Sequence, residues 1–291
     1  MKLQNVLITE KQTSLQYYRQ NYDPPEDVIP ADILELKKRE HAEHLESVEI
    51  IKDALKRRGI SFQTIFMPYA AMEEFSGRGL IISVGGDGTV LNTARYIRDN
   101  TPLLTVKSES DSVGALCTIK AKDFSVALEK ILSEDFRIEP WTRAEGRFNN
   151  KMDLALNEIA VGTRYFNGMA TYEVKFNGQK EIQRSSKIII STGAGSTGWY
   201  NNIHNSNGVF HPSAPELRFT VSESLRSHDY RMLHEHVMPG DVLEIVSLMD
   251  TDGAISFDGD KNKRLYHFPI AQKIFVRISD KPLYVIKPND S

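Results

Sequence analysis

Short apolar runs of strand length recur through the first half of the chain. They occupy residues 5–9, 60–67, 80–84 and 103–106. Apolar runs of this length, bounded by polar or glycine-rich segments, are typical of the buried strands of a parallel sheet. The polar residues 11–30 predict an irregular connection, and residues 69–79 have the composition of a disordered one.

Helical spacing occurs between these runs. Residues 31–58 predict a long helix that ends before Gly59, and its apolar face holds Leu45, Val48, Ile51 and Leu55. Residues 89–98 predict a second helix, which Thr89 can cap and which buries Val90, Ala94 and Ile97. Residues 123–132 predict a further helix with Asp123 as its N-cap. Strand, glycine turn, helix and strand over residues 80–106 form a βαβ unit.

Alternation with a period of two replaces this pattern beyond about residue 141. Tyr172, Val174 and Phe176 share one face of a predicted strand, and Asn177-Gly178 forms a two-residue hairpin turn that needs positive φ. Further strands are predicted at residues 242–248, 254–257, 273–278 and 283–286. We therefore expect an α/β domain over residues 1–140 and a β-rich domain over residues 141–291, whose last strands can pack back on the first domain.

Composition narrows the class of protein. The 291 residues are 40% hydrophobic, enough for two domains, and a formal net charge of -3 with a pI near 6.3 argues against nucleic-acid binding. No stretch approaches the roughly 18 apolar residues of a membrane helix. The single cysteine, Cys117, cannot form an internal disulfide and is interpreted as a small buried apolar residue. These features predict a cytoplasmic protein.

The glycine turn at residues 85–89 carries the most chemistry. Gly85, Gly86 and Gly88 allow backbone amides to approach a ligand closely, and a turn between a strand and a helix N-terminus can cradle phosphates. Asp87 lies among them, where a carboxylate fits best if it holds a divalent metal or takes a proton. That combination indicates phosphoryl transfer. The dinucleotide-binding G-x-G-x-x-G pattern fails, because Leu91 stands at its last position.

A second loop, residues 191–199, alternates hydroxyls with glycines after an apolar strand. It has the glycine spacing of a Walker A loop but carries Trp199 where that motif needs lysine. Residues 194–198 also resemble the nucleophile elbow of a hydrolase, for which His234 and His236 are available later in the chain. We expect that histidine pair to lie at the surface without metal, and His41 and His44 to face solvent.

Three motifs in this order resemble the NAD kinase family. The family's GGDGT turn, asparagine-acidic pair and Ser/Thr/Gly loop are matched by residues 85–89, Asn157-Glu158 and residues 191–199, and residues 255–259 resemble its later strand. The turn alone is shared with diacylglycerol and sphingosine kinases. Ser185-Ser186, Gly193 and Trp199 look like the divergent mitochondrial-type branch. Ser186-Lys187 stands where most members carry an acidic residue and glycine.

The resemblance implies a Rossmann-like N-terminal domain with a parallel sheet, a sandwich-like C-terminal domain, and a site in the cleft between them. It implies a homodimer or larger homo-oligomer that uses ATP and Mg²⁺ to phosphorylate the 2′-hydroxyl of the adenosine ribose of NAD or NADH. Asp87 resembles the catalytic base. The residues that would bind ATP or the acceptor are Gly85, Gly86, Gly88, Thr89, Asn157, Glu158, Ser191, Thr192, Ser196, Thr197, Gly198 and Trp199.

Two alternatives remain open from the sequence. A lipid kinase, or another small-molecule kinase of the same superfamily, shares the glycine turn but should present an apolar entry surface, whereas the loop at residues 191–199 suits a polar acceptor. A non-catalytic nucleotide-binding regulator would bind the same ligands without turnover. Activity with NAD or NADH separates these alternatives from an NAD kinase.

Overall fold

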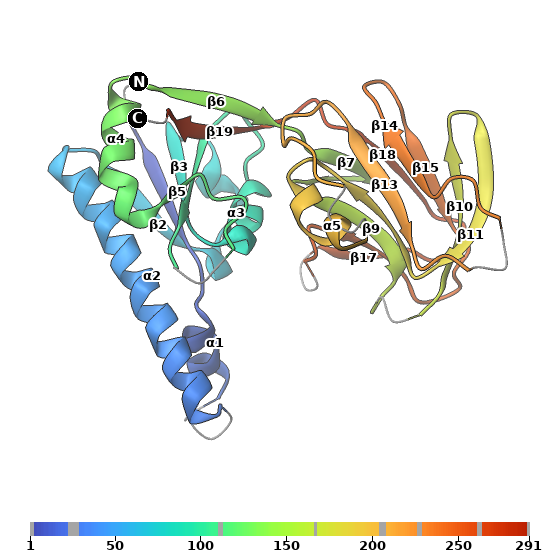
Figure 1. The fold of residues 1–291 in the computed structure, drawn as a ribbon, viewed down its shortest axis with the longest axis horizontal. Coiled ribbons are helices and arrows are strands. Elements are labelled where there is room, and N and C mark those ends of the chain that lie inside the picture. Colours follow the sequence, from blue (N-terminus) through green and yellow to red (C-terminus); the bar gives the residue numbers. More distant parts are fainter. Residues whose placement is uncertain are drawn as a thin grey trace. The chain divides into compact units, whose positions relative to one another are not determined.

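The computed structural model describes residues 3–22, 29–109, 113–165, 168–203, 208–225, 229–260 and 264–289. The chain divides into two compact units, one formed by Met1–Glu139 with Leu283–Ser291 and the other by Pro140–Pro282. Figure 1 shows that the first unit combines helices with a sheet and that the second consists mainly of strands. Within the described residues, no helix combines the length and apolar character needed to cross a bilayer.

The first unit is built on a mainly parallel sheet. Its strands are β1 (Val6–Glu10), β2 (Phe62–Phe66), β3 (Leu80–Gly85), β4 (Leu103–Lys107), β5 (Ile119–Lys120), β6 (Phe136–Trp141) and β19 (Leu283–Pro288). The order across the sheet is β2-β1-β3-β4-β19-β6, with β5 also beside β4. The pairs β1–β2, β1–β3, β3–β4, β4–β5 and β4–β19 are parallel. The carboxyl ends of β3 and β4 therefore meet at one edge.

Helices cover both faces of this sheet (Figure 1). They are α1 (Ser14–Asn21), α2 (Ala31–Arg57), α3 (Asp87–Ala94) and α4 (Phe124–Leu132), with single 3₁₀ turns η2 (Met67–Tyr69), η3 (Met72–Phe75) and η4 (Ala121–Asp123). Apolar side chains of α2 and α4, such as Ile51 and Leu128, join one core with Ile8 and Ile82 of the sheet. On the opposite face, Thr93 of α3 hydrogen-bonds Thr9 through their hydroxyls at 2.8 Å.

The predicted parallel sheet and long helix are confirmed, but the connections differ from the prediction. Within the segment 11–30, which was predicted to be irregular, residues 14–21 form α1 because Thr13 and Gln16 make a reciprocal capping box. Residues 23–28 of that segment lie outside the described residues. The segment predicted as disordered begins at the last residue of η2 and contains η3, and buried Phe75 stacks on Tyr96 with ring centroids 4.7 Å apart. That aromatic contact orders the segment.

One helix start, one capping contact and one residue of a helix face also differ from the prediction. Helix α3 begins at Asp87, so Thr89 lies inside its first turn and does not cap it. Asp123 stands at the N-cap of α4, but its side chain makes no capping hydrogen bond. On α2, Val48, Ile51 and Leu55 are buried as predicted, but Leu45 is 44% exposed and His44 is only 1% exposed. Gly59 has φ +65°, as a C′ glycine should.

The described part of the second unit contains two antiparallel sheets. Its elements are β7 (Ala144–Phe148), β8 (Lys151–Ala155), β9 (Glu158–Thr163), β10 (Ala170–Phe176), β11 (Gln179–Ser185), β12 (Lys187–Ser191), η5 (Gly195–Thr197), α5 (Trp199–Ile203), β13 (Leu217–Ser222), β14 (His234–Val237), β15 (Leu243–Ser247), β16 (Gly253–Phe257), β17 (Leu265–His267) and β18 (Lys273–Ile278). One sheet has the order β11-β10-β15-β18-β7-β8 and the other β14-β13-β12-β9-β16-β17.

The inner faces of these two sheets share one apolar core. Tyr172, Val174 and Phe176 of β10 are buried in it, together with Ile188 and Ile190 of β12. The β10–β11 hairpin turns at Asn177 and Gly178, whose φ values are +48° and +75°. The alternation in the sequence therefore predicted both the inward face and the turn correctly. Residues 283–288 form β19 and belong to the sheet of the first unit.

Candidate functional site

The glycine turn of the first unit lies where β3 ends and α3 begins. Gly86 is the N-cap and Asp87 the first residue of the helix. A Cβ atom added to Gly85 would lie 2.1 Å from the Thr89 hydroxyl oxygen, so only glycine fits there, whereas a Cβ on exposed Gly88 would meet no atom within 4 Å. The turn thus packs tightly on its inner side and leaves open space above the helix N-terminus. A phosphate group fits such a place.

The Asp87 carboxylate is held by the backbone of another segment. Its Oδ1 accepts a hydrogen bond from the Leu116 amide at 2.8 Å, and its Oδ2 accepts one from the Ala115 amide at 3.1 Å. The side chain is only partly buried. An oriented carboxylate with free lone pairs, beside glycine amides, can accept a proton from a hydroxyl.

Cys117 differs from the prediction of a simple buried apolar residue. It is half-buried, and its thiol lies 3.7 Å from the Gly85 carbonyl oxygen, to which it donates. Burial raises the pKa of the thiol to about 12, and the negative charge of Asp87 contributes in the same direction. The thiol therefore stays protonated and acts as a hydrogen-bond donor to the turn rather than as a nucleophile.

In the second unit, Asn157 and Glu158 lie at the start of β9 and against Asp258. The Asn157 amide donates to Asp258 Oδ1 at 2.7 Å, and the Asp258 amide donates to the Glu158 carbonyl at 2.9 Å. The Asn157 side-chain oxygen is buried and has no hydrogen-bond partner among the described residues. Buried polar atoms are nearly always paired, so this oxygen marks a place where a ligand donor or a water is expected.

Burial controls the charge of the acidic side chains here. Glu158 is 5% exposed, and burial raises its pKa to about 8, with a further contribution from the nearby Asp258 charge. Burial also raises the pKa of Asp258, although Arg264 opposes that effect. Arg264 donates to Asp258 at 2.8 Å and to Asp153 at 2.9 Å, and is itself 4% exposed. Glu158 is therefore protonated at neutral pH and can donate a hydrogen bond as well as accept one.

The loop at residues 191–199 wraps around Asn157. The Thr192 amide donates to the Asn157 carbonyl at 2.9 Å, and a Cβ on Gly195 would lie 2.1 Å from that same oxygen. A Cβ on Gly198 would lie 3.9 Å from Nδ2 of the Asn157 side chain. Asn157 and the loop at residues 191–199 are thus in contact. The order of the motifs along the chain did not predict this contact.

The residues of this loop divide into a buried group and an outer group. Ser191, Thr192 and Ser196 are fully buried and donate to backbone carbonyls of Thr192, Leu156 and Gly193, respectively. Thr197 is exposed, and Gly198 and Trp199 are partly so. The buried group shapes the loop, whereas Thr197 lies at its surface and donates its hydroxyl to the Ala194 carbonyl at 3.2 Å.

Lys187 and Trp199 form a contact at the edge of the same loop. The Lys187 ammonium lies 4.0 Å from the centre of the Trp199 ring, as in a cation–π interaction. Burial lowers the pKa of Lys187, and Glu223 opposes the shift. The neighbouring Ser186 hydroxyl donates to the Glu223 carboxylate.

The geometry contradicts the hydrolase alternative. The Ser196 hydroxyl donates to the Gly193 carbonyl at 2.6 Å, while the hydroxyl of Thr220 hydrogen-bonds His234 at 2.8 Å and the carboxylate of Glu216 hydrogen-bonds His236 at 2.7 Å. No serine–histidine pair of a nucleophile elbow is formed by these residues. In the described ranges, His, Cys, Asp and Glu side chains nowhere gather in threes suited to a metal ion. His44, predicted at the surface, is buried instead.

Asp258, Arg264 and Asp153 are the supporting residues that the motif reasoning did not single out. Asp258 lies in the segment 255–259, which resembles a later strand of the NAD kinase family, so its acidic side chain was the sequence signal for a site residue there. Asp153 and Arg264 are 111 positions apart, and no local pattern connects them.

The chain thus combines an α/β unit, which carries a glycine turn at a helix N-terminus, with a unit of two antiparallel sheets, which carries a Ser/Thr/Gly loop around Asn157. Residues 26–136 match the family model described as the ATP-NAD kinase N-terminal domain. Over these residues the chain is similar to the NAD kinase family.

Individual proteins are also similar to this chain. An NAD kinase from Archaeoglobus fulgidus is 31% identical over 153 residues, which is 52% of this chain and 59% of that protein. The chain matches about half the length of the first curated relatives. The crystal structure of the Archaeoglobus fulgidus NAD kinase in complex with ATP has a TM-score of 0.71 at 20% identity, covering 99% of this chain and 94% of that one. Yeast NADH kinase complexed with NADH has a TM-score of 0.68 at 16% identity, with coverages of 99% and 85%. At these identities the two structures show the shared fold.

Proposed function

We propose that the protein is an NAD kinase, which transfers the γ-phosphoryl group of ATP to the 2′-hydroxyl of the adenosine ribose of NAD or NADH. The observation that carries the proposal is Asp87, a carboxylate oriented by two backbone amides within a glycine turn at the N-terminus of a helix. Such a group can take a proton beside bound phosphates. The names of the relatives, and the ATP and NADH in the two solved structures, support the same reaction.

In this proposal the first unit binds ATP. Backbone amides at Gly86 and Gly88 and the N-terminus of α3 hold its phosphates, and Gly85 and Thr89 pack beneath them. Asp87 removes the proton of the acceptor hydroxyl, the hydroxyl oxygen forms a bond to the γ-phosphorus, and ADP leaves. The catalytic contribution is orientation and charge stabilisation rather than covalent chemistry.

The donor set also fits a Mg²⁺ ion that arrives with the nucleotide. Mg²⁺ is commonly held by one or two carboxylates together with substrate phosphates and waters, and Asp87 is a carboxylate at the right kind of place. When bound, the ion would neutralise charge on the phosphates.

The second unit binds the acceptor in this proposal. The buried, unpaired oxygen of Asn157 can accept a hydrogen bond from a ribose hydroxyl, and protonated Glu158 can donate one to an adenine or ribose acceptor. Thr197, Gly198 and Trp199 line the acceptor pocket, while Ser191, Thr192 and Ser196 maintain the loop. This polar lining favours a nucleotide over a lipid acceptor.

A direct assay tests the proposal. Purified protein is incubated with ATP, Mg²⁺ and either NAD or NADH, and the 2′-phosphorylated product is measured by an NADP-specific dehydrogenase. We expect product with at least one acceptor. Binding of ATP and NAD without product would instead establish a nucleotide-binding regulator, and phosphorylation of a diacylglycerol but of neither dinucleotide would establish a lipid kinase.

The proposal extends to a cytoplasmic homo-oligomer. The single, half-buried cysteine is suited to a reducing compartment, and the sequence resembles a family whose members assemble as homo-oligomers. Light scattering after gel filtration should give a mass that is a multiple of 33.0 kDa. A mass of one chain at micromolar concentration would contradict the oligomer.

A further inference from the structure

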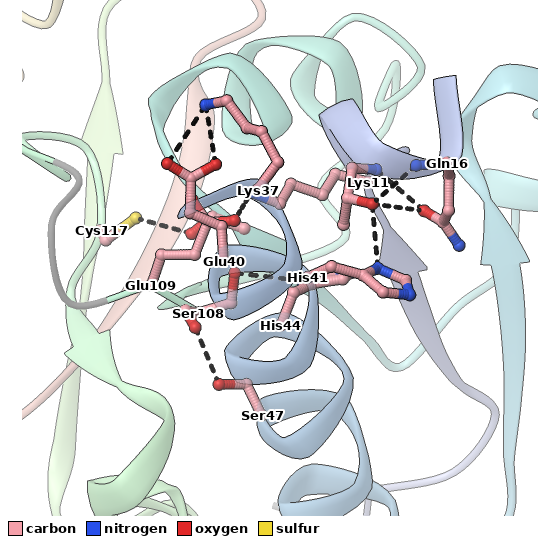
Figure 2. Close-up of polar contacts among 12 residues, drawn as sticks. Lys11, Gln16, Lys37, Glu40, His41, His44, Ser47, Ser108, Glu109 and Cys117 are labelled. Atoms are coloured by element: carbon pink, nitrogen blue, oxygen red, sulfur yellow. Dashed lines mark hydrogen bonds and ion pairs between the residues drawn. The ribbon is translucent and has the colours of Figure 1, made fainter. Parts of the chain in front are cut away.

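The long helix α2 is joined to the glycine turn through a buried polar contact. His44 Nδ1 and the Ser108 hydroxyl are hydrogen-bonded at 3.1 Å, and the Ser47 hydroxyl donates to the Ser108 carbonyl at 3.0 Å. Figure 2 shows both contacts, with His44 and Ser47 projecting from successive turns of one helix toward Ser108. All three side chains are buried, with exposures of 1%, 7% and 4% for His44, Ser47 and Ser108.

Ser108 in turn holds the residue that opens the glycine turn. Its amide donates to the Gly85 carbonyl at 3.2 Å, directly after the last paired residues of β3 and β4. The Cys117 thiol donates to that same carbonyl at 3.7 Å. Gly85 is followed within two residues by Asp87, so the direction of the backbone at Gly85 determines where the Asp87 side chain begins.

The turn that orients Asp87, which contains Ala115 and Leu116, is bound by β4. The Thr105 hydroxyl donates to the Leu116 carbonyl at 2.8 Å and accepts from the Thr118 amide at 2.9 Å. Thr105 lies in the middle of β4 and Ser108 directly follows the strand, so one short segment supports both the turn that carries Asp87 and the amides that bind its carboxylate.

The chemistry of His44 suits a fixed hydrogen-bonding role. Burial lowers the pKa of His44 to about 3, and the positive charges of Lys11, His41 and Lys52 contribute in the same direction. The ring is therefore neutral at physiological pH and cannot act as a general acid. A neutral polar ring costs free energy in an otherwise apolar helix–sheet contact unless it is paired, so the pairing with Ser108 selects one placement of α2 against β4.

Neighbouring contacts hold the same segment. Lys11, after β1, forms an ion pair with Glu109, whose side chain is 14% exposed. Residues 108 and 109 are thus bound from two directions, by α2 and by the segment that follows β1 (Figure 2).

We propose that His44 and Ser47 are positioning residues for the phosphoryl transfer: through Ser108 and Gly85 they hold the glycine turn, and hence Asp87, in its reactive orientation. This inference rests on the proposed function. It assigns to α2, which carries none of the matched motifs, a part in the alignment of the catalytic base.

Kinetics provide the first test. His44→Leu and Ser108→Ala each remove the hydrogen bond and should lower kcat about fivefold to tenfold, the effect of one lost hydrogen bond, while KM for ATP changes less than twofold. His44→Asn retains a hydrogen-bonding atom near the position of Nδ1 and should recover most of the activity. The double variant His44→Leu with Ser108→Ala should be no worse than either single change, because both remove the same bond.

A matched control lies one turn away on the same helix. His41 hydrogen-bonds the Thr13 hydroxyl at 3.0 Å and contacts a different segment, so His41→Leu should leave kcat within about twofold of the original. Equal losses in His41→Leu and His44→Leu would indicate a general effect on α2 and would overturn the proposal.

Hydrogen exchange gives a readout that does not depend on activity. In His44→Leu and Ser108→Ala, the backbone amides at positions 108 and 116 should exchange about fivefold to tenfold faster than in the original protein. In Ser47→Ala, the same two amides should also exchange faster. Unchanged exchange, or faster exchange with unchanged kcat, would overturn the positioning role. If the original protein makes no NADP, the proposed function fails by itself, and the exchange experiment still decides whether α2 holds the turn.

Discussion

Asp87 and Leu116 are linked by a hydrogen bond of 2.8 Å from the Leu116 amide to the Asp87 carboxylate, across 29 positions of sequence. The bond orients the side chain of the first residue of α3, and its donor is a backbone amide rather than another side chain. Both oxygens are oriented by backbone, since Ala115 binds the other one. A carboxylate held in this way keeps a defined direction while its remaining lone pairs stay available.

The first prediction follows from that arrangement. Asp87→Asn should lower kcat by about 10²–10⁴, because the amide cannot accept the proton of the acceptor hydroxyl, while the thermal midpoint stays within a few degrees. Steady-state formation of the phosphorylated dinucleotide measures the change. Asp53→Asn is the control, since Asp53 is 56% exposed on α2 and pairs only with Lys56 in the described contacts. Near-normal turnover of Asp87→Asn would exclude a role as base.

The second prediction separates folding from ATP binding at Gly88. Alanine there meets no atom within 4 Å, and it replaces glycine inside a helix, so Gly88→Ala should raise stability by about 0.5–1 kcal/mol. The new methyl group occupies the open space above the turn and should raise KM for ATP at least about tenfold, a loss of roughly 1.4 kcal/mol. Thermal unfolding and ATP titration measure the two effects.

The control for this prediction is Gly168→Ala, where the added Cβ would lie 3.7 Å from a Thr163 methyl group in ordinary contact. That variant should retain the original KM for ATP. An unchanged KM in Gly88→Ala would mean that phosphates do not approach this turn.

The third prediction concerns pH and Glu158. The pKa of Glu158 is raised from 4.5 to about 8, so the native state binds a proton that the unfolded chain releases between these values. Stability from this group is fully present below pH 4.5 and is lost as pH rises to about 8. Glu158→Gln keeps the neutral shape, so its thermal midpoint should fall less than that of the original protein between pH 5 and pH 8.5.

Calorimetry across this pH range measures the effect, with Glu129→Gln as the exposed control. Parallel midpoint curves for Glu158→Gln and the original protein would show that Glu158 is ionised in the native state. That result would also remove the hydrogen-bond donor assigned to it in the acceptor site.

The fourth prediction concerns Arg264. Arg264→Met leaves Asp153 and Asp258 buried without their cation and should lower the free energy of unfolding by about 3–5 kcal/mol. Because Asp258 accepts the Asn157 amide, affinity for the dinucleotide should fall as well. Urea unfolding and dinucleotide titration measure these losses.

Arg58→Met is the control, because Arg58 is 52% exposed and pairs with Glu129, which is 50% exposed. Its cost should lie near 0–1 kcal/mol, as for surface pairs in general. Equal costs for the two arginine variants would contradict the view that burial makes the Arg264 network important.

The sequence by itself determined the features that depend on nearby residues. Apolar runs placed the strands β1, β3 and β4, the Asn177-Gly178 turn defined the β10–β11 hairpin, and the glycine turn located Asp87 between a strand and a helix. These signals are local, because side-chain periodicity and positive φ act over a few residues. The capping box of α1, formed by Thr13 and Gln16, is equally local.

Tertiary structure alone decided which residues meet. The buried face of α2 includes His44 rather than Leu45, since adjacent helical positions point about 100° apart and only packing against the sheet selects between them. The contacts of Asp87 with Leu116 and of Arg264 with Asp153 join positions 29 and 111 residues apart. Such pairs leave no periodic trace in the chain, because their proximity arises from strand order and loop paths, and folding pays the closure entropy only when the whole core forms.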